Sequence, residues 1–206
     1  MSATDGTTAA FAIAAVAALG AGVGALVRVH FLPTGYNPVR DAVSDYGVGP
    51  HRAYYRAMVV ALGIGAGLLT VALSREPGVG SAGLVWLAVY AAARVSIAAF
   101  PTDLPGRPVT PVGRVHLALA AAAFTAIAIA APTISSDLNG QPGWTDVCGF
   151  VSFVGRAVSV TAIATFVAAV VPRLRVTAFG AIERLLYLTS LVWLLTVAVH
   201  LADLRA

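Results

Sequence analysis

Six blocks of apolar residues, each about twenty residues long, constrain this chain more than any other feature of its sequence. A helix needs about twenty apolar residues to cross a hydrocarbon core of about 30 Å. Of the 206 residues, 59% are hydrophobic and 11% are charged, whereas soluble domains carry about a quarter of charged residues. The sequence therefore predicts an all-α polytopic membrane protein, with six transmembrane helices in one bundle and a single domain over residues 1–206.

Short segments rich in Pro, Gly and charged residues separate the predicted spans. The first apolar block is longer than the core of a signal peptide, and no positively charged segment precedes it, so we expect it to be retained as a span. Within the first connection, Val39–Tyr46 can form a short interfacial helix. We predict spans over residues 9–29, 54–73, 80–100, 112–131, 147–171 and 179–201.

The arginines predict the orientation of the spans, because positively charged loops remain in the cytoplasm. All 13 basic residues are Arg. Only Arg75 and Arg205 belong to the side with the termini. We therefore expect a plasma-membrane protein whose first, third and fifth loops are cytoplasmic and whose termini are both outside. The arginines of those loops and the adjoining helix ends are Arg28, Arg40, Arg52, Arg56, Arg107, Arg114, Arg173, Arg175 and Arg184.

Several function classes have no support in the sequence. No segment supplies the basic soluble surface that nucleic-acid binding needs. A single cysteine, Cys148, excludes an intrachain disulfide and a thiolate metal cluster. The phosphate-binding loop, the dinucleotide-binding glycine pattern, HExxH and CxxC are all absent. We predict no metal and no cofactor.

Polar residues concentrate in Asn37–His51, directly after the first span. This segment contains Asp41 and Tyr46, which we take as candidate substrate-binding residues. The predicted orientation brings three further ionisable residues, Asp103, His116 and Glu183, to the same end of the bundle as Asp45. Ionisable groups at a membrane boundary are costly unless paired, so they tend to be functional; the alternative is that they lie in headgroup water. The candidate catalytic residues are Asp45, Asp103, Glu183 and His116.

Asp103 and His116 flank the third loop, so a helical hairpin can bring the carboxylate and the imidazole together. Such a pair can orient a proton donor or share a metal ion. Alternatively, Asp103 caps the start of the fourth span and closes the loop. The sequence leaves both interpretations open.

Two arginines and several aromatic residues lie inside the predicted spans. Exposure of Arg94 or Arg156 to lipid would be costly, so we expect both to face the interior. Arg94 then pairs with Asp45 or Asp103, or holds the phosphate or carboxylate head group of a ligand. The aromatic candidates for lining an apolar substrate cavity are Trp86, Tyr90 and Trp193.

Four short motifs resemble the family catalogued as domain of unknown function 998, a group of small bacterial and archaeal membrane proteins with six predicted helices. The motifs are SDYG (Ser44–Gly47), FPTD (Phe100–Asp103), GRVH (Gly113–His116) and the pair Glu183–Arg184. The resemblance covers most of the chain. It implies the fold and the topology and leaves the chemistry open.

A looser, physical likeness is to integral-membrane terpene cyclases. Those enzymes are similarly small and all-helical, and are thought to protonate an alkene or epoxide with a membrane-buried carboxylic acid. The likeness rests on carboxylates beside an apolar bundle, on the aromatic residues, and on the missing metal and nucleotide motifs.

Three functions follow as hypotheses. The most concrete is a proton-initiated cyclase for a prenylated or lipid-like substrate, in which a buried carboxyl group is the acid and aromatic faces shield a carbocation. The second is a metal-dependent lipid hydrolase that uses His116, Asp45 and Asp103 as ligands. The third is a non-catalytic lipid-binding or transport-related protein. All three imply membrane lipids or a hydrophobic small molecule as partners.

Overall fold

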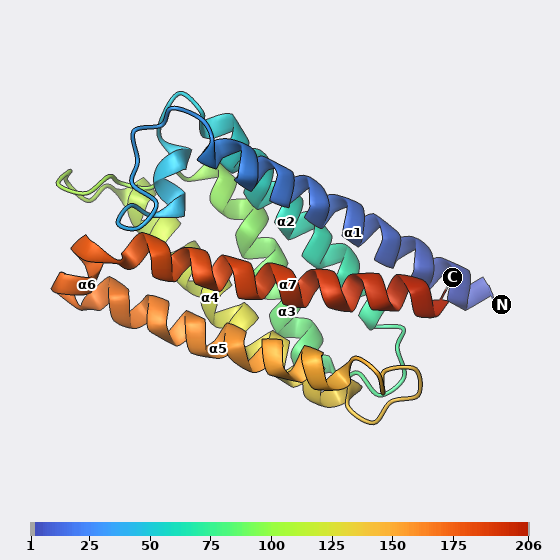
Figure 1. Ribbon diagram of the computed structural model, residues 1–206. Helices are drawn as coiled ribbons and strands as arrows, with labels where there is room; N and C mark the ends of the chain where they lie inside the picture. The colour runs from blue at the N-terminus through green and yellow to red at the C-terminus, as the bar shows by residue number, and fades with distance from the viewer. Residues whose placement is uncertain (1–2, 206) are drawn as a thin grey trace.

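The computed structural model describes residues 3–205, and every regular element in that range is a helix. Six of these helices are long and apolar enough to cross a membrane, which confirms the predicted fold class. The arginine count also predicts that both termini are outside. The terminal residues 1, 2 and 206 lie outside the described range. The long helices are α1 (Ala3–His30), α2 (Arg52–Leu73), α3 (Ser81–Ser96), α4 (Pro111–Leu138), α5 (Cys148–Val170) and α7 (Phe179–Arg205) (Figure 1). The short ones are η1 (Val43–Gly47), η2 (Ile97–Ala99) and α6 (Pro172–Thr177).

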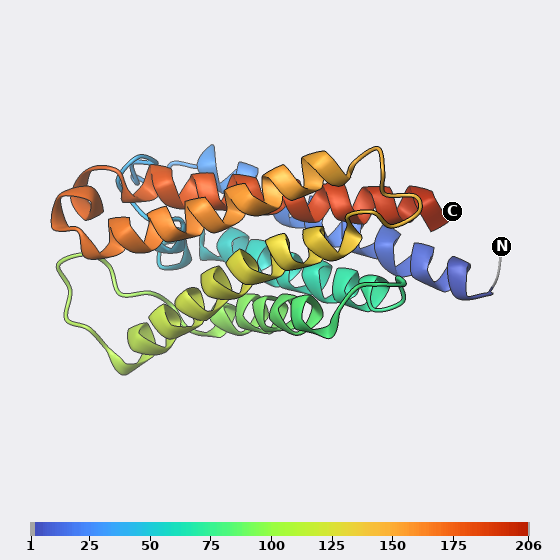
Figure 2. The same ribbon diagram turned by 90° about the horizontal axis from the view of Figure 1, so that it is seen from below.

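The long helices form a closed ring. Each packs against its neighbours in chain order, and α7 closes the ring by packing against both α5 and α1. Their loops collect at two ends, as Figures 1 and 2 show. We call the end with residues 31–51, 100–110 and 171–178 the first-loop end, and the end with residues 74–80 and 139–147 the opposite end.

Glycines allow α2 to approach both α1 and α3 closely. A Cβ atom added at Gly65 would lie 2.7 Å from Cγ of Leu19 in α1. One added at Gly63 would lie 2.8 Å from the carbonyl oxygen of Ala91 in α3. Small residues permit such contact between membrane helices, so larger side chains at these two positions would push the ring apart.

The fourth span is longer than predicted, because α4 continues through Pro132 to Leu138. The sequence interpretation ended this helix before Pro132, since proline lacks the N–H that bonds to the carbonyl four residues earlier. That carbonyl belongs to Ala128, and the Ser159 hydroxyl of α5 donates to it at 2.6 Å. A neighbouring hydroxyl is a known way to satisfy a carbonyl freed by proline in a membrane helix.

The first loop also differs from the predicted helix over 39–46, because only Val43–Gly47 is helical. The carbonyl oxygen of Val39 accepts the N–H of Ala181 at 2.9 Å, and that of Arg40 accepts the N–H of Gly180 at 3.3 Å. These N–H groups are at the start of α7, where a helix has no internal acceptors for its first N–H groups. The loop backbone therefore serves as the cap of α7, which places the first loop over the end of the bundle.

Candidate functional site at the first-loop end

Glu183 lies in the second turn of α7, directly beneath the first loop. Its side chain is 4% exposed, and Oε2 accepts the backbone N–H of Val43 at 2.7 Å. The loop that caps α7 thus also covers this carboxyl group. Of the three candidate acids from the sequence, Asp45, Asp103 and Glu183, it is the one that lies within a long helix.

Asp45 belongs to η1 and is also 4% exposed. Its Oδ2 accepts the N–H of Ala42 at 3.0 Å. Burial raises the pKa of Asp45 from 3.8 to about 6, and the nearby charge of Asp41 adds to the rise. The Ala42 hydrogen bond and the charge of Arg184 oppose it. At a pH slightly below neutral, a sizeable fraction of Asp45 therefore carries a proton.

Asp45 and Glu183 lie within electrostatic range of each other. Among the side chains that the structure describes, neither carboxyl group forms an ion pair. Their only hydrogen-bond donors there are the backbone N–H groups of Ala42 and Val43. The first-loop end therefore contains two buried carboxyl groups that no cation contacts.

Arg184 links the first loop to the ring through hydrogen bonds. Its guanidinium donates to the carbonyl oxygen of Asp41 at 2.8 Å, to Oη of Tyr46 at 3.0 Å and to Nε2 of His30 at 2.9 Å. Nδ1 of His30 lies 2.7 Å from the carbonyl oxygen of Leu26, which fixes Nδ1 as the protonated nitrogen. The sequence interpretation did not select His30; a histidine that ends an apolar span beside a polar loop was the available signal.

Arg94 lies inside the ring, as predicted, and is 2% exposed. Its Nη1 donates to Oη of Tyr187 at 2.8 Å, and its Cζ lies 4.9 Å from the centroid of that ring. Its Nε and Nη2 are buried without a partner. The predicted contact with Asp45 or Asp103 is wrong. Asp45 instead accepts the N–H of Ala42, and Asp103 accepts the N–H of Thr110 in the third loop.

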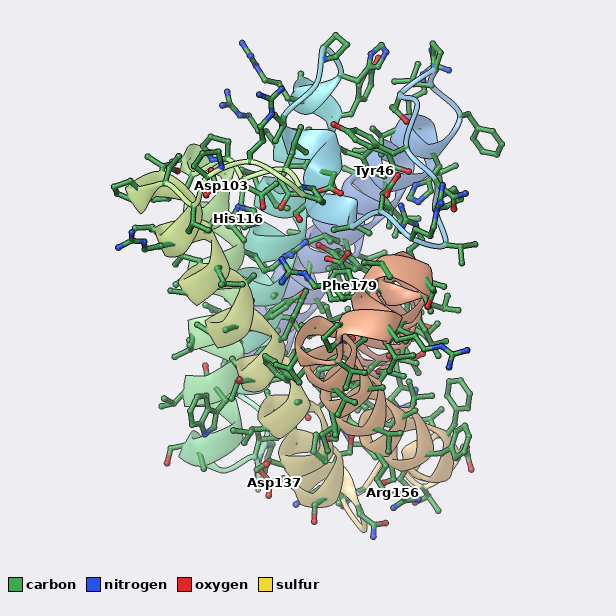
Figure 3. The ribbon with its side chains drawn as sticks, turned by 90° about the vertical axis from the view of Figure 1, so that its left-hand side faces the viewer. Tyr46, Asp103, His116, Asp137, Arg156 and Phe179 are labelled. Atoms are coloured by element: carbon green, nitrogen blue, oxygen red, sulfur yellow. The ribbon has the colours of Figure 1, made fainter. Side chains whose placement is uncertain are left out.

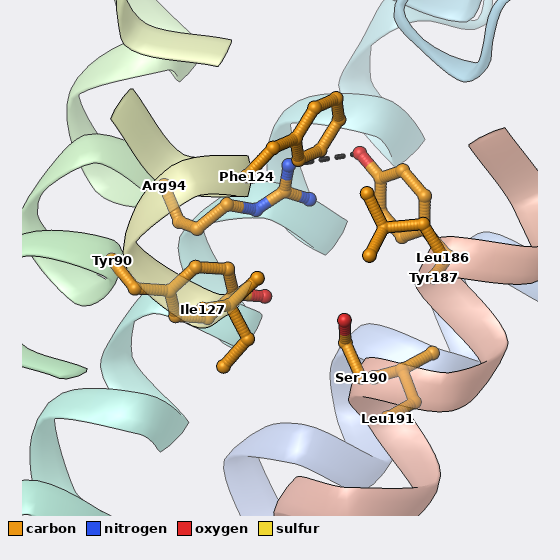
Figure 4. Close-up of a pocket in the computed structure, with 8 residues that line it drawn as sticks. All are labelled: Tyr90, Arg94, Phe124, Ile127, Leu186, Tyr187, Ser190 and Leu191. Carbon is orange, nitrogen blue, oxygen red and sulfur yellow. Dashed lines mark hydrogen bonds between the residues drawn. The ribbon is translucent and has the colours of Figure 1, made fainter. Parts of the chain in front are cut away.

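A small cavity of about 10 Å³ adjoins Arg94. Tyr90 lines it, as the sequence interpretation expected of this residue. Ser190 also lines it, is buried, and has a hydroxyl without a partner. Ser190 was not predicted, because a lone serine in an apolar span gives no signal of its own. The cavity lies between α3, α4 and α7, and its lining residues are Tyr90, Arg94, Phe124, Ile127, Leu186, Tyr187, Ser190 and Leu191 (Figure 4).

Asp103 closes the third loop instead of pairing with His116. Its carboxylate accepts the N–H of Thr110 at 2.7 Å and the Thr110 hydroxyl at 2.9 Å, and Thr110 caps α4. Nδ1 of His116 lies 2.7 Å from the carbonyl oxygen of Phe100, and its buried Nε2 has no partner. Figure 3 looks along the ring from the first-loop end and shows both residues beside α4. These contacts match the loop-closing interpretation of Asp103.

Four other predicted substrate-binding residues lie away from the cavity. Trp86 is 36% exposed on the outer face of α3, so its predicted interior position is wrong. Trp193 is buried, but its indole N–H donates to Oγ of Ser135 at 2.9 Å. Asp41 accepts the N–H of Asn37 at 2.6 Å within the loop. Tyr46 is buried against Arg184.

Arg156 is exposed on α5, so the prediction that it faces the interior is also wrong (Figure 3). It lies eight residues after Cys148, the first residue of α5 at the opposite end. A long arginine side chain at that depth can extend along the helix towards the headgroup region. The cost of lipid exposure, on which the prediction rested, is therefore avoided without an interior partner.

The residues of the proposed metal site do not come together. Within the described residues, no group of three or more His, Cys, Asp and Glu side chains is arranged to hold a metal ion. Asp45, Asp103 and His116 instead have the separate backbone contacts given above. The hydrolase hypothesis therefore lacks its ligand set.

The family described as "Protein of unknown function (DUF998)" matches residues 13–200. The chain belongs to this family. The match begins within α1 and ends within α7, so it includes the whole first-loop end. A search of the curated proteins finds no match, and a search of the solved structures finds none.

Proposed function

We propose that this DUF998 protein is a membrane-embedded enzyme that protonates an isoprenoid or lipid-like substrate and thereby starts its cyclisation. The observation that supports this most is the pair of buried carboxyl groups, Asp45 and Glu183, which no cation of the described residues contacts. An acid catalyst must hold a proton near neutral pH, and burial without a direct ion pair favours the protonated form. The raised pKa of Asp45, about 6, fits this requirement.

In this proposal, each step of the reaction is assigned to one group. The O–H bond of the Glu183 carboxyl breaks, and its proton adds to a terminal alkene carbon of the substrate. The tertiary carbocation that results is attacked by the next alkene, which forms the ring bond. A C–H proton then leaves to a base, for which the unpartnered Nε2 of His116 is the candidate. Asp45 lies in the loop above Glu183 and is suited to return a proton to it.

Aromatic rings face the cavity where the carbocation would form. Tyr90, Phe124 and Tyr187 line it from three different helices, and aromatic faces stabilise cations. The expected roles of Trp86 and Trp193 therefore pass to these three residues.

A specific observation favours the alternative of a non-catalytic lipid-binding or transport-related protein. The cavity volume of about 10 Å³ is about what one water molecule needs. A cyclisation substrate can enter only if α7 moves away from α3 and α4. α7 packs mainly on α1 and α5 and makes few contacts across the ring, so such a movement would break little packing.

The experiment measures turnover of prenylated substrates with a terminal alkene by the purified protein in D₂O. An isomerisation that begins with protonation yields a cyclic product that carries one deuterium. Glu183→Gln and Asp45→Asn keep the side-chain size and remove the transferable proton, so we expect turnover to fall about 100-fold or more in each, within the range of general-acid contributions. Glu76→Gln, at a buried glutamate of the opposite end, is the matched control. Wild-type turnover in both Glu183→Gln and Asp45→Asn, or a product without deuterium, would overturn the proposal.

A further inference from the structure

The cavity beside Arg94 has the features of a binding site for an anion. Arg94 keeps a positive charge in the interior, at 2% exposure, where an unpaired charge is costly. No described carboxylate forms an ion pair with it. Within residues 3–205, its only hydrogen bond is to the neutral hydroxyl of Tyr187. Glu183 lies within electrostatic range of Arg94 without contacting it, so no described residue supplies a counter-ion in contact with this cation.

The unused donors of Arg94 are the two that suit an oxyanion best. Nε–H and the adjacent Nη2–H point in parallel and form the edge of guanidinium that carboxylates and phosphates contact in bidentate fashion. Both atoms are buried without a partner, while Nη1 is occupied by Tyr187. In Figure 4 this edge faces the space between Tyr90 and Ser190.

Ser190 adds a second, independent observation. Its side chain is 4% exposed, its hydroxyl has no partner, and it lines the same cavity from α7. A hydroxyl can donate to an oxyanion that Arg94 already holds. Hydrogen-bond donors from α3 and α7 thus converge on one cavity. Neither helix needs these donors there for its own stability.

We infer that this cavity binds one oxyanion, a carboxylate or a phosphate, through Nε and Nη2 of Arg94 and Oγ of Ser190. The inference specifies the substrate class of the proposed function and rests on it in that respect. A carbocation next to an unneutralised guanidinium would be repelled, whereas an anionic head group on Arg94 removes this repulsion. The apolar part of the ligand would then occupy the interior between α3, α4 and α7.

A water molecule is the competing occupant, since the cavity has room for about one. Water can satisfy the free N–H and O–H groups but leaves the charge of Arg94 unbalanced. The two occupants are distinguishable, because only an anion would bind more tightly to the wild type than to a variant without the charge.

The experiment measures thermal unfolding of the purified full chain in an uncharged detergent, with four probes: decanoate, decyl phosphate, decanol and inorganic phosphate. A ligand that binds only the folded state raises the Tm with its concentration. We expect decanoate and decyl phosphate to stabilise the wild type and decanol to have no effect. Tighter binding of decyl phosphate than of inorganic phosphate assigns the site to an amphiphile, and equal binding assigns it to a free anion.

The variants separate the contributions to binding. Arg94→Gln should weaken decyl phosphate binding about 10- to 100-fold, and Ser190→Ala about 3- to 10-fold, as expected for charged and neutral hydrogen bonds. Arg94→Lys keeps the charge without the parallel donors and should fall between wild type and Arg94→Gln. Arg114→Gln, an exposed arginine of the same end, is the matched control with wild-type affinity.

The outcomes are decisive even if one variant fails to fold. Equal affinity of wild type and Ser190→Ala, or of decanoate and decanol, would overturn the inference without use of Arg94→Gln. Binding that depends on Arg94 in a protein that cyclises no substrate would leave the anion site standing and refute the proposed function. Turnover that depends on Glu183, with no anion binding, would do the reverse.

Discussion

The two ends of the ring differ in how deeply the polar side chains that contact the loops are buried. At the opposite end, Asp137 accepts the N–H of Gly80 at 2.9 Å, and His200 donates from Nε2 to the carbonyl oxygen of Gly143 at 2.7 Å. Each contact ties a helix to a loop backbone and leaves the side chain near the surface. These two contacts close the loops without a deeply buried charge, although Glu76 of the same end is also buried.

At the first-loop end, loop closure and burial of ionisable groups occur together. Glu183 accepts a backbone N–H of the first loop much as Asp137 does for the second, yet it is buried within the ring. Arg94 lies in the same region without an ion pair. Because buried charges cost stability unless they are paired, we propose that this end retains them for binding or chemistry. The predictions below test whether the two ends differ in this way.

The largest expected effect is that of Arg184→Ala. This residue joins α7 to α1, to the first loop and to Tyr46, and its loss leaves the hydroxyl of Tyr46 and Nε2 of His30 without that donor. We expect a loss of about 3 kcal/mol, as for other buried networks. The measurement is the free energy of unfolding in detergent.

Arg75→Ala at the opposite end is the matched control. Arg75 donates to the carbonyl oxygen of Val71 in its own helix, at 2.8 Å, and lies over the ring of Phe11. Its loss should cost less than about 1 kcal/mol, as for exposed interactions. Equal losses for the two variants would remove the contrast between the ends.

The second prediction concerns pH and Asp45. Its pKa is about 6 in the folded protein and 3.8 in the reference state, so the folded state binds the proton more tightly. This contribution to stability is complete below about pH 4 and is lost as the pH rises through about 6. Asp45→Asn does not titrate. The Tm of the variant minus that of the wild type should therefore be more positive at pH 7.5 than at pH 4.5, by a few degrees. A difference that does not change with pH would show that Asp45 is not held in an apolar environment.

Much of the fold could be predicted from the sequence, because the apolar blocks report directly on the membrane. The end of α4 could not, since the effect of Pro132 depends on a hydroxyl from another helix, Ser159. The same limit applies to the site. Chain order alone brings Asp45 and Glu183 to the same end, whereas the partner of Arg94 depends on which residue of α7 faces α3. That residue is Tyr187, and no motif marks it.

The third prediction concerns Ser159, whose hydroxyl satisfies the carbonyl that Pro132 leaves free. Ser159→Ala should cost about 1–2 kcal/mol, because it leaves a carbonyl in the interior without its donor. In the double variant Pro132→Ala/Ser159→Ala, the new N–H at position 132 can bond to Ala128, so the loss should be smaller than in Ser159→Ala alone. Unfolding free energies of the four proteins in this cycle measure the coupling. Additive losses would mean that Ser159 does not compensate for the proline.

The smallest effect expected is that of Asp103→Asn, and it refines the comparison of the two ends. Asp103 lies at the first-loop end, but it accepts the N–H of Thr110 as Asp137 accepts that of Gly80. Both aspartates hold the residue before a helix, since α4 begins at Pro111 and α3 at Ser81. Asp103→Asn and Asp137→Asn should therefore each cost less than about 1 kcal/mol, since asparagine keeps an acceptor oxygen but loses the charge that strengthens the hydrogen bond. Amide hydrogen exchange should show faster exchange at Thr110 in the first variant and at Gly80 in the second. If Asp103→Asn instead destabilised the protein as strongly as Arg184→Ala does, the effect of a substitution would depend on the end of the ring where the residue lies, and not on whether its contact closes a loop at the surface.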